Sequence, residues 1–131
     1  MNSVVHFEIP VDDAQRASTF YSETFGWQLT KVPMQGMDYW MVTTVETDEK
    51  RMPKKPGAIN GGLTPRDETA KTPVIVINVP NVDDYIKKVE AAGGKVVMPK
   101  QTVGNMGYYA RVTDSEGNVI GIWEDIPHPH G

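Results

Sequence analysis

The sequence contains no cysteine, and this absence removes several kinds of site at once. A chain without thiols forms no disulfide framework, holds no cysteine-ligated zinc and has no thiol nucleophile. That composition fits a reducing compartment, and we expect a cytoplasmic protein. Long apolar runs are missing too, since "VIVINV" at 74–79 is much too short to cross a bilayer and the first residues lack a charged-then-apolar signal pattern. We therefore expect no membrane partner.

Positive charge is also scarce. Lysine and arginine number 13 against 17 aspartates and glutamates, which gives a formal net charge of −4. The sequence has no basic block that would follow a phosphate backbone, so nucleic acid is not an expected partner. The length of 131 residues, with 39% hydrophobic and 23% charged residues, is typical of one globular domain.

Two segments of the chain repeat one pattern of strand, helix and glycine stop. In the first, the apolar residues of "VVHFEIP" at 4–10 precede Asp13, a good helix cap, and Gly26 follows the helical spacing. The second contains an apolar strand at 74–79, Asn81 as the cap and Gly94 as the stop. The two caps, like the two glycines, are separated by 68 residues. The pattern predicts helices near 13–25 and 82–92.

The later strands repeat as well. "YWMVTT" at 39–44 corresponds to "YARVTD" at 109–114, and "NGGL" at 60–63 resembles "VIGIW" at 119–123, an apolar strand interrupted by glycine. Each half of the chain is therefore predicted to have the order β-α-β-β-β. We expect a single α+β domain with module one at 1–64, a linker at 65–71, module two at 72–126 and a C-terminal tail at 127–131.

The chain has the sequence motifs "FYSETFGW", "AAGGKV" and "DSEGNVIG" within such a tandem repeat. With these motifs it resembles the vicinal oxygen chelate superfamily. This superfamily includes glyoxalases, ring-cleaving dioxygenases, fosfomycin-resistance enzymes and bleomycin-binding proteins. The resemblance covers nearly the whole chain. It implies two modules whose curved mixed sheets form a cup, with the helices outside, and it implies a homodimer.

The resemblance also implies positions for a catalytic metal, on the first and last strand of each module. By position these fall on His6, Val74, Gly62 and Gly121, of which only His6 has a donor atom. Three protein ligands are usual in a catalytic zinc site. We therefore expect no resident metal and no cofactor.

Other ligands could still hold a divalent ion. Glu8 shares the strand parity of His6 and could assist, whereas Glu124 is expected to face away from the side of Gly121 unless a bulge intervenes. His128 and His130 belong to a proline-spaced terminus of a kind that is more often disordered than a metal site.

The same positions suggest a site for an organic ligand. Glycine within a strand often marks a close approach of a ligand or another backbone. The expected lining combines apolar and polar side chains, as small-molecule pockets do. The candidate ligand-binding residues are His6, Glu8, Tyr39, Met41, Gly62, Tyr109, Arg111, Gly121 and Trp123. Taken singly, each of these residues is better explained by packing or solvation, and the case for a pocket rests on their convergence.

Three classes of function stay open. The first is a protein that binds a small organic molecule without changing it, as the bleomycin-binding relatives do. The second is a lyase, isomerase or oxidoreductase that uses non-standard metal ligands or a metal-free proton-transfer pair of His6 and Glu8. The third is a scaffold subunit without catalysis. We favour the first, and the sequence does not name the ligand.

Overall fold

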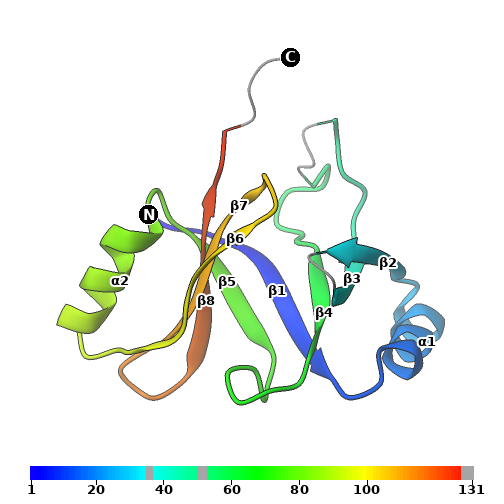
Figure 1. Ribbon diagram of the computed structural model, residues 1–131. Coiled ribbons are helices and arrows are strands. Elements are labelled where there is room, and N and C mark those ends of the chain that lie inside the picture. The colour runs from blue at the N-terminus through cyan, green and yellow to red at the C-terminus, as the bar shows by residue number, and fades with distance from the viewer. Residues whose placement is uncertain (35–36, 50–52, 128–131) are drawn as a thin grey trace. The chain divides into compact units, whose positions relative to one another are not determined.

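The computed structural model describes residues 1–34, 37–49 and 53–127. Each half of the chain has the predicted order β-α-β-β-β, so the predicted α+β fold is confirmed (Figure 1). The elements of the first half are β1 (Val4–Val11), α1 (Ala14–Phe25), β2 (Gln28–Met34), β3 (Met37–Thr43) and β4 (Gly61–Pro65). Those of the second half are β5 (Val74–Asn78), α2 (Val82–Ala91), β6 (Val96–Val103), β7 (Gly107–Thr113) and β8 (Val119–Asp125).

The chain divides into two compact units. The first module is Val5–Pro73, and the second consists of Val74–Gly131 together with Met1–Val4. The first residues are held to the second module by hydrogen bonds: the Asn78 backbone N–H donates to the Ser3 carbonyl at 2.9 Å, and the Asn2 side-chain amide donates to the Asn78 carbonyl at 3.0 Å.

Both modules have the same strand order and the same directions of pairing. In the first module the order is β2-β3-β4-β1, with β1 parallel to β4 and the other pairs antiparallel. In the second module the order is β6-β7-β8-β5, with β5 parallel to β8. The register is also equivalent, because Glu8 pairs with Gly62 and Val76 pairs with Gly121.

Local signals explain where α1 begins and ends. The Asp13 carboxylate accepts a hydrogen bond from the Arg16 backbone N–H at 3.0 Å, which satisfies one of the free N–H groups of the first turn. Gly26 stops the helix in the left-handed conformation at φ 73°, where a side chain would be strained. The Asn81 side chain caps α2 in the same way, through the Asp84 N–H at 2.9 Å.

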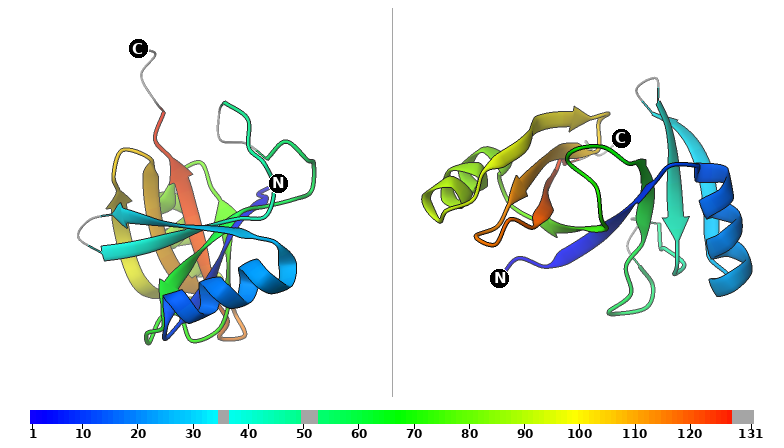
Figure 2. Two further views of the ribbon diagram at one scale, coloured as in Figure 1. Left: turned by 90° about the vertical axis from the view of Figure 1, so that its right-hand side faces the viewer. Right: turned by 90° about the horizontal axis from the view of Figure 1, so that it is seen from below.

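A cluster of buried apolar residues lies in the second module, between α2 and one face of its sheet. It consists of Val79, Val82, Ala110, Val112 and Ile122. In the first module α1 lies against β2, and no residue of this helix is buried (Figure 2). No helix in the described ranges is long and apolar enough to span a membrane.

Candidate functional site

One face of the first module brings together the residues predicted from that half of the chain. Gly62 pairs with Glu8 on one side and with Met41 on the other. Because side chains alternate along strands, His6 and Tyr39 share this face with those three residues. Strand parity therefore places all five predicted residues of the first module on one surface.

The hydroxyl of Tyr39 is at the centre of this face. It lies 3.2 Å from His6 Nε2, within hydrogen-bond distance. The same hydroxyl also lies over Gly62, so closely that a Cβ atom at position 62 would overlap with it. Glycine at this position thus makes room for the tyrosine.

The charge state of His6 follows from its surroundings. Burial lowers the pKa of His6, and the negative charge of Glu8 opposes this shift without cancelling it. The imidazole is consequently neutral at neutral pH, with one nitrogen that donates and one that accepts. Glu8 itself is only 7% exposed. His6 thus interacts electrostatically with Glu8 and makes hydrogen-bond contact with Tyr39. Proton transfer between His6 and Glu8 stays a prediction.

The second module repeats this arrangement with different chemistry. Gly121 pairs with Arg111 and with Val76, and Tyr109 pairs with Trp123. The Arg111 Nε donates a hydrogen bond to the Tyr109 hydroxyl at 3.1 Å. A Cβ atom at position 121 would lie 2.6 Å from that hydroxyl, which is closer than real Cβ contacts come. Arg111 is only 4% exposed, so this face carries a buried cation where the first module has a neutral imidazole.

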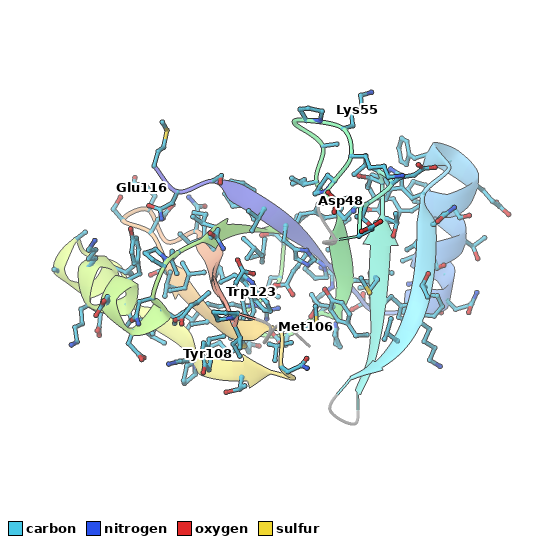
Figure 3. All side chains as sticks on the ribbon, turned by 90° about the horizontal axis from the view of Figure 1, so that it is seen from above. Asp48, Lys55, Met106, Tyr108, Glu116 and Trp123 are labelled. Carbon is cyan, nitrogen blue, oxygen red and sulfur yellow. The ribbon has the colours of Figure 1, made fainter. Side chains whose placement is uncertain are left out.

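Trp123 stands beside Tyr109 on the same face. The two rings are tilted by 49° with centroids 6.4 Å apart, and Trp123 extends from β8 as labelled in Figure 3. The Trp123 Nε1 donates to the Asp125 carboxylate at 2.8 Å, which fixes the indole orientation. The aromatic pair and Arg111 give this face an apolar wall next to a positive charge.

Of the alternative metal ligands, Glu8 shares the face of His6, whereas Glu124 lies away from the side of Gly121. The Glu124 carboxylate accepts a hydrogen bond from the Val82 N–H at 2.9 Å, at the start of α2. The expectation that Glu124 points away from the side of Gly121 is therefore confirmed. His128 and His130 lie outside the described residues.

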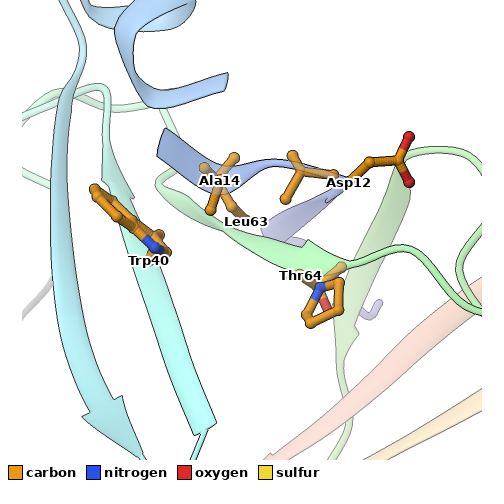
Figure 4. A pocket seen from close by; sticks show the side chains of 7 residues that line it. Asp12, Ala14, Trp40, Leu63 and Thr64 are labelled. Carbon is orange, nitrogen blue, oxygen red and sulfur yellow. The ribbon is translucent and has the colours of Figure 1, made fainter. Parts of the chain in front are cut away.

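Two hollows of the first module lie away from the His6 face. The smaller one, of about 110 Å³, is lined in part by Trp40 and Leu63 (Figure 4). These two residues pair with each other and have the opposite strand parity to Tyr39 and Gly62. The larger hollow, of about 370 Å³, lies beside α1. Neither coincides with the face that the sequence predicted.

The residues at the metal positions implied by the resemblance do not fit a divalent ion. Val74, Gly62 and Gly121 offer no donor atom, and a tyrosine ring fills the space over each glycine. Within residues 1–34, 37–49 and 53–127, no three histidine, aspartate or glutamate side chains come together as a metal site. One imidazole holds a divalent ion only weakly.

Comparison with known families identifies the superfamily of the chain. The family model "Glyoxalase/Bleomycin resistance protein/Dioxygenase superfamily" matches residues 3–122. The chain belongs to this superfamily. Sequence relatives agree: "Putative glyoxylase CFP32" of Mycobacterium tuberculosis is 32% identical over 124 residues, and a "Glyoxylase-like domain-containing protein" of Didymella fabae is 30% identical over 120 residues.

Coverage differs between these two superfamily relatives. The match spans 92% of this chain but only 45% of the Mycobacterium tuberculosis protein, so the chain covers less than half of that relative. For the Didymella fabae protein, the match covers 88% of both chains.

Solved structures share the fold at lower sequence identity. A methylmalonyl-CoA epimerase in complex with methylmalonyl-CoA and NH4+ has a TM-score of 0.65 and 18% identity, covering 98% of this chain and 99% of its own. The methylmalonyl-CoA epimerase of Mycobacterium tuberculosis has a TM-score of 0.61 and 18% identity, covering 95% and 88%. At these identities the likeness shows the fold alone.

Sequence reasoning predicted the residues of both faces but not how they contact one another. The candidate residues included Tyr39 with Gly62 and Tyr109 with Gly121, and the repeat related the two glycines and the two third strands. The signal that was missed is the pairing itself: each module combines a tyrosine on its third strand with a glycine on its fourth.

Proposed function

We propose that the chain binds a small organic molecule on its tyrosine-bearing faces and does so without a resident catalytic metal. One observation carries the proposal. In each module a tyrosine hydroxyl fills the space over the last-strand glycine, at a position where the family resemblance implies a metal ligand. A hydrogen-bonding group has thus replaced a metal ligand in both halves.

The second module favours a ligand with a carboxylate on an aromatic body. Arg111 and the Tyr109 hydroxyl lie 3.1 Å apart and together form a charged hydrogen-bonding pair, which suits a carboxylate. The ring of Trp123 next to them suits a flat apolar group. The first module, with neutral His6 beside Tyr39, suits an uncharged hydroxyl or carbonyl group.

Binding of simple probes tests this proposal. We would titrate benzoate, phenylacetate and the neutral analogue benzamide, and measure affinity by ligand-observed NMR. We expect the carboxylates to bind and benzamide to bind at least about fivefold more weakly, because hydrogen bonds to charged groups are the stronger ones.

The matched variants are Tyr109→Phe and the control Tyr108→Phe. Tyr108 neighbours Tyr109 on β7 but pairs with Glu124, and Lys100 lies over its ring, on the other face of the strand. We expect Tyr109→Phe to weaken benzoate binding about tenfold, since a hydrogen bond to a charged group is lost, and Tyr108→Phe to leave it unchanged. Equal binding of benzoate and benzamide, or equal effects of the two variants, would refute the proposal. Failure of all probes to bind would favour the scaffold function.

A second candidate function is proton transfer by the pair of His6 and Tyr39. The lowered pKa of His6 and its 3.2 Å distance to the Tyr39 hydroxyl favour this candidate. In such a reaction the imidazole takes a proton from a carbon next to a carbonyl group, and solvent later returns one. The test is exchange of that hydrogen for deuterium in D2O, followed by NMR on phenylacetate and its methyl ester. Exchange that is lost in Tyr39→Phe would support catalysis, and absence of exchange would leave binding as the function.

A further inference from the structure

The Asp125 carboxylate links the indole of Trp123 to the neighbouring strand. Its Oδ1 accepts a hydrogen bond from the Trp123 Nε1 at 2.8 Å, two residues back along β8. Its Oδ2 accepts a hydrogen bond from the side-chain amide of Asn78, on β5, at 3.1 Å. The acceptor of the indole N–H is therefore held from two sides.

Asn78 is itself anchored. It pairs with Trp123 across β5 and β8, and its side-chain amide also lies 3.4 Å from the Trp123 carbonyl oxygen. Its backbone N–H donates to the Ser3 carbonyl at 2.9 Å. The position of the Asp125 carboxylate thus rests on a hydrogen-bonded chain within the second module, although the aspartate is exposed.

Gly107 leaves the space that the indole occupies. It pairs with Asp125 across β7 and β8, and strand parity puts it on the same face as Tyr109 and Trp123. A Cβ atom at position 107 would overlap with Cζ2 of Trp123 and would lie 2.6 Å from its Cε2. The six-membered ring of the indole therefore lies over this glycine, as the Tyr109 hydroxyl lies over Gly121.

These contacts define one orientation of a ring that a ligand can still reach. Trp123 is only half-buried, and its ring centroid is 6.4 Å from that of Tyr109. Aromatic groups attract one another most strongly in offset-stacked or edge-to-face arrangements, so the orientation of the indole matters for a planar ligand. A ring that is already fixed also loses little conformational entropy when a ligand packs on it.

We propose that Asp125 is a positioning residue that sets the ring selectivity of the second module. By holding the Trp123 indole over Gly107, it makes this module bind a planar aromatic carboxylate more tightly than a saturated ring carboxylate of similar size. The inference rests on the proposed binding of carboxylates at Arg111 and Tyr109. Those two residues recognise the charge, and the oriented indole recognises the planar ring.

A comparison of benzoate with cyclohexanecarboxylate isolates this effect. Both probes carry one negative charge and a ring of six carbon atoms, but only benzoate is planar and aromatic. Because the charges are equal, electrostatic repulsion by Asp125 cancels in the ratio of the two affinities. With ligand-observed NMR we expect the wild-type protein to bind benzoate roughly three- to tenfold more tightly, as is usual for a well-oriented aromatic pair.

The variant that removes the acceptor is Asp125→Ala, and its ratio should fall to within about twofold of one. Asp125→Asn keeps an oxygen that accepts from the indole, and the Asn78 amide can turn to accept from the new NH2 group, so this variant should keep most of the selectivity. The matched control is Asp84→Ala, at an exposed position of α2, which should leave the ratio unchanged. Gly107 is not substituted, because a methyl group there would also press on the Glu124 carbonyl oxygen at 2.5 Å and disturb β8.

Exchange of the Trp123 indole N–H with solvent reports the positioning without any ligand. In ¹⁵N-labelled protein, with the signal assigned by its loss in Trp123→Phe, exchange should be at least about tenfold faster in Asp125→Ala than in the wild type. It should be nearly unchanged in Asp125→Asn and Asp84→Ala. Circular dichroism confirms that each variant is folded, and a role of Asp125 in stability alone would leave the affinity ratio of the folded protein unchanged.

The outcomes separate this inference from the proposed function. Carboxylates that bind better than benzamide, with a benzoate to cyclohexanecarboxylate ratio that is near one or insensitive to Asp125→Ala, would overturn the role of Asp125 and leave the proposed function intact. Unchanged exchange of the indole N–H in Asp125→Ala would overturn it as well. Failure of both carboxylates to bind the wild-type protein would refute the proposed function and the selectivity with it.

Discussion

The two helices of this chain start alike and are packed differently. Asp13 caps α1 and Asn81 caps α2, each by accepting a hydrogen bond from the backbone N–H three residues later. After the cap the helices diverge: α2 buries Val82 completely, whereas α1 buries none of its residues. The cap determines where a helix begins, but the side chains that follow determine how much of it is buried.

The composition of the apolar faces explains this difference. Tyr85, Ile86 and Val89 of α2 pack on a buried cluster of aliphatic residues. The aromatic residues of α1 instead contact one another and Trp27. Among the described residues, the second module contributes more of the buried core and the first module keeps more large apolar side chains exposed.

The largest effect is expected from the core of the second module. Ile122→Ala removes a side chain that is 3% exposed and leaves a cavity, so the free energy of unfolding should fall by about 2–5 kcal/mol. Urea denaturation measures this loss. Ile75→Ala is the control, because Ile75 lies on β5 and is 48% exposed. Equal losses in both variants would contradict the assignment of the core.

A smaller loss is expected from the strand glycines. Gly62→Ala places a methyl group against the Tyr39 hydroxyl, and Gly121→Ala does the same against Tyr109. Each variant should destabilise the fold by roughly 1–3 kcal/mol, because overpacking forces the ring to move.

Removing the tyrosine ring as well tests whether the ring causes the loss of stability in Gly62→Ala. Combining Gly62→Ala with Tyr39→Ala removes the obstructing ring, so the two substitutions should not be additive in a double-mutant cycle. Additive losses would show that the ring is not what makes glycine necessary at position 62.

The pH dependence of stability should reflect His6. Because burial lowers the folded-state pKa of His6 below its unfolded value, the unfolded chain binds more protons as the pH falls. The contribution of His6 to the free energy of unfolding is therefore fully present above its unfolded-state pKa of about 6.5. It is lost as the pH falls towards the lower pKa of the folded state.

Denaturation at pH 7.5 and at pH 5.5 measures this effect. The loss of stability between the two should be larger in the wild-type protein than in His6→Asn, which cannot titrate. An identical loss in both proteins would mean that His6 is not buried in a neutral form.

The smallest effect is expected on α1. Phe20→Ala removes a side chain that is 54% exposed, so the free energy of unfolding should change by less than about 1 kcal/mol. A loss as large as that of Ile122→Ala would show that α1 contributes to a core after all.

The sequence allowed much of the fold to be predicted, because its signals are local. The caps Asp13 and Asn81 and the stop at Gly26 predicted the helices to within about a residue of the observed bounds. The turn at 115–118 is also local: Asp114 accepts hydrogen bonds from the Asn118 side chain and from the N–H groups of Asn118 and Glu116, which lower its pKa.

The site could be predicted only in part, for a physical reason. Strand alternation assigns His6, Tyr39 and Gly62 to one face but does not say which atoms touch. The contact between Tyr39 and His6 depends on the direction of a long side chain and on the pairing of β3 with β4. The exposure of α1 depends on tertiary packing, which a helical spacing of apolar residues does not reveal.

The metal content of the purified protein tests most directly whether tyrosine hydroxyls have replaced the metal ligands in this chain. We predict that elemental analysis finds zinc, nickel, manganese and iron at well below one ion per chain, and that adding these ions hardly changes the melting temperature. Val74, Gly62 and Gly121 provide no donor atom, and one histidine holds a divalent ion weakly. A tightly held ion near one per chain, lost in His6→Ala, would contradict this account and favour a metal-dependent enzyme.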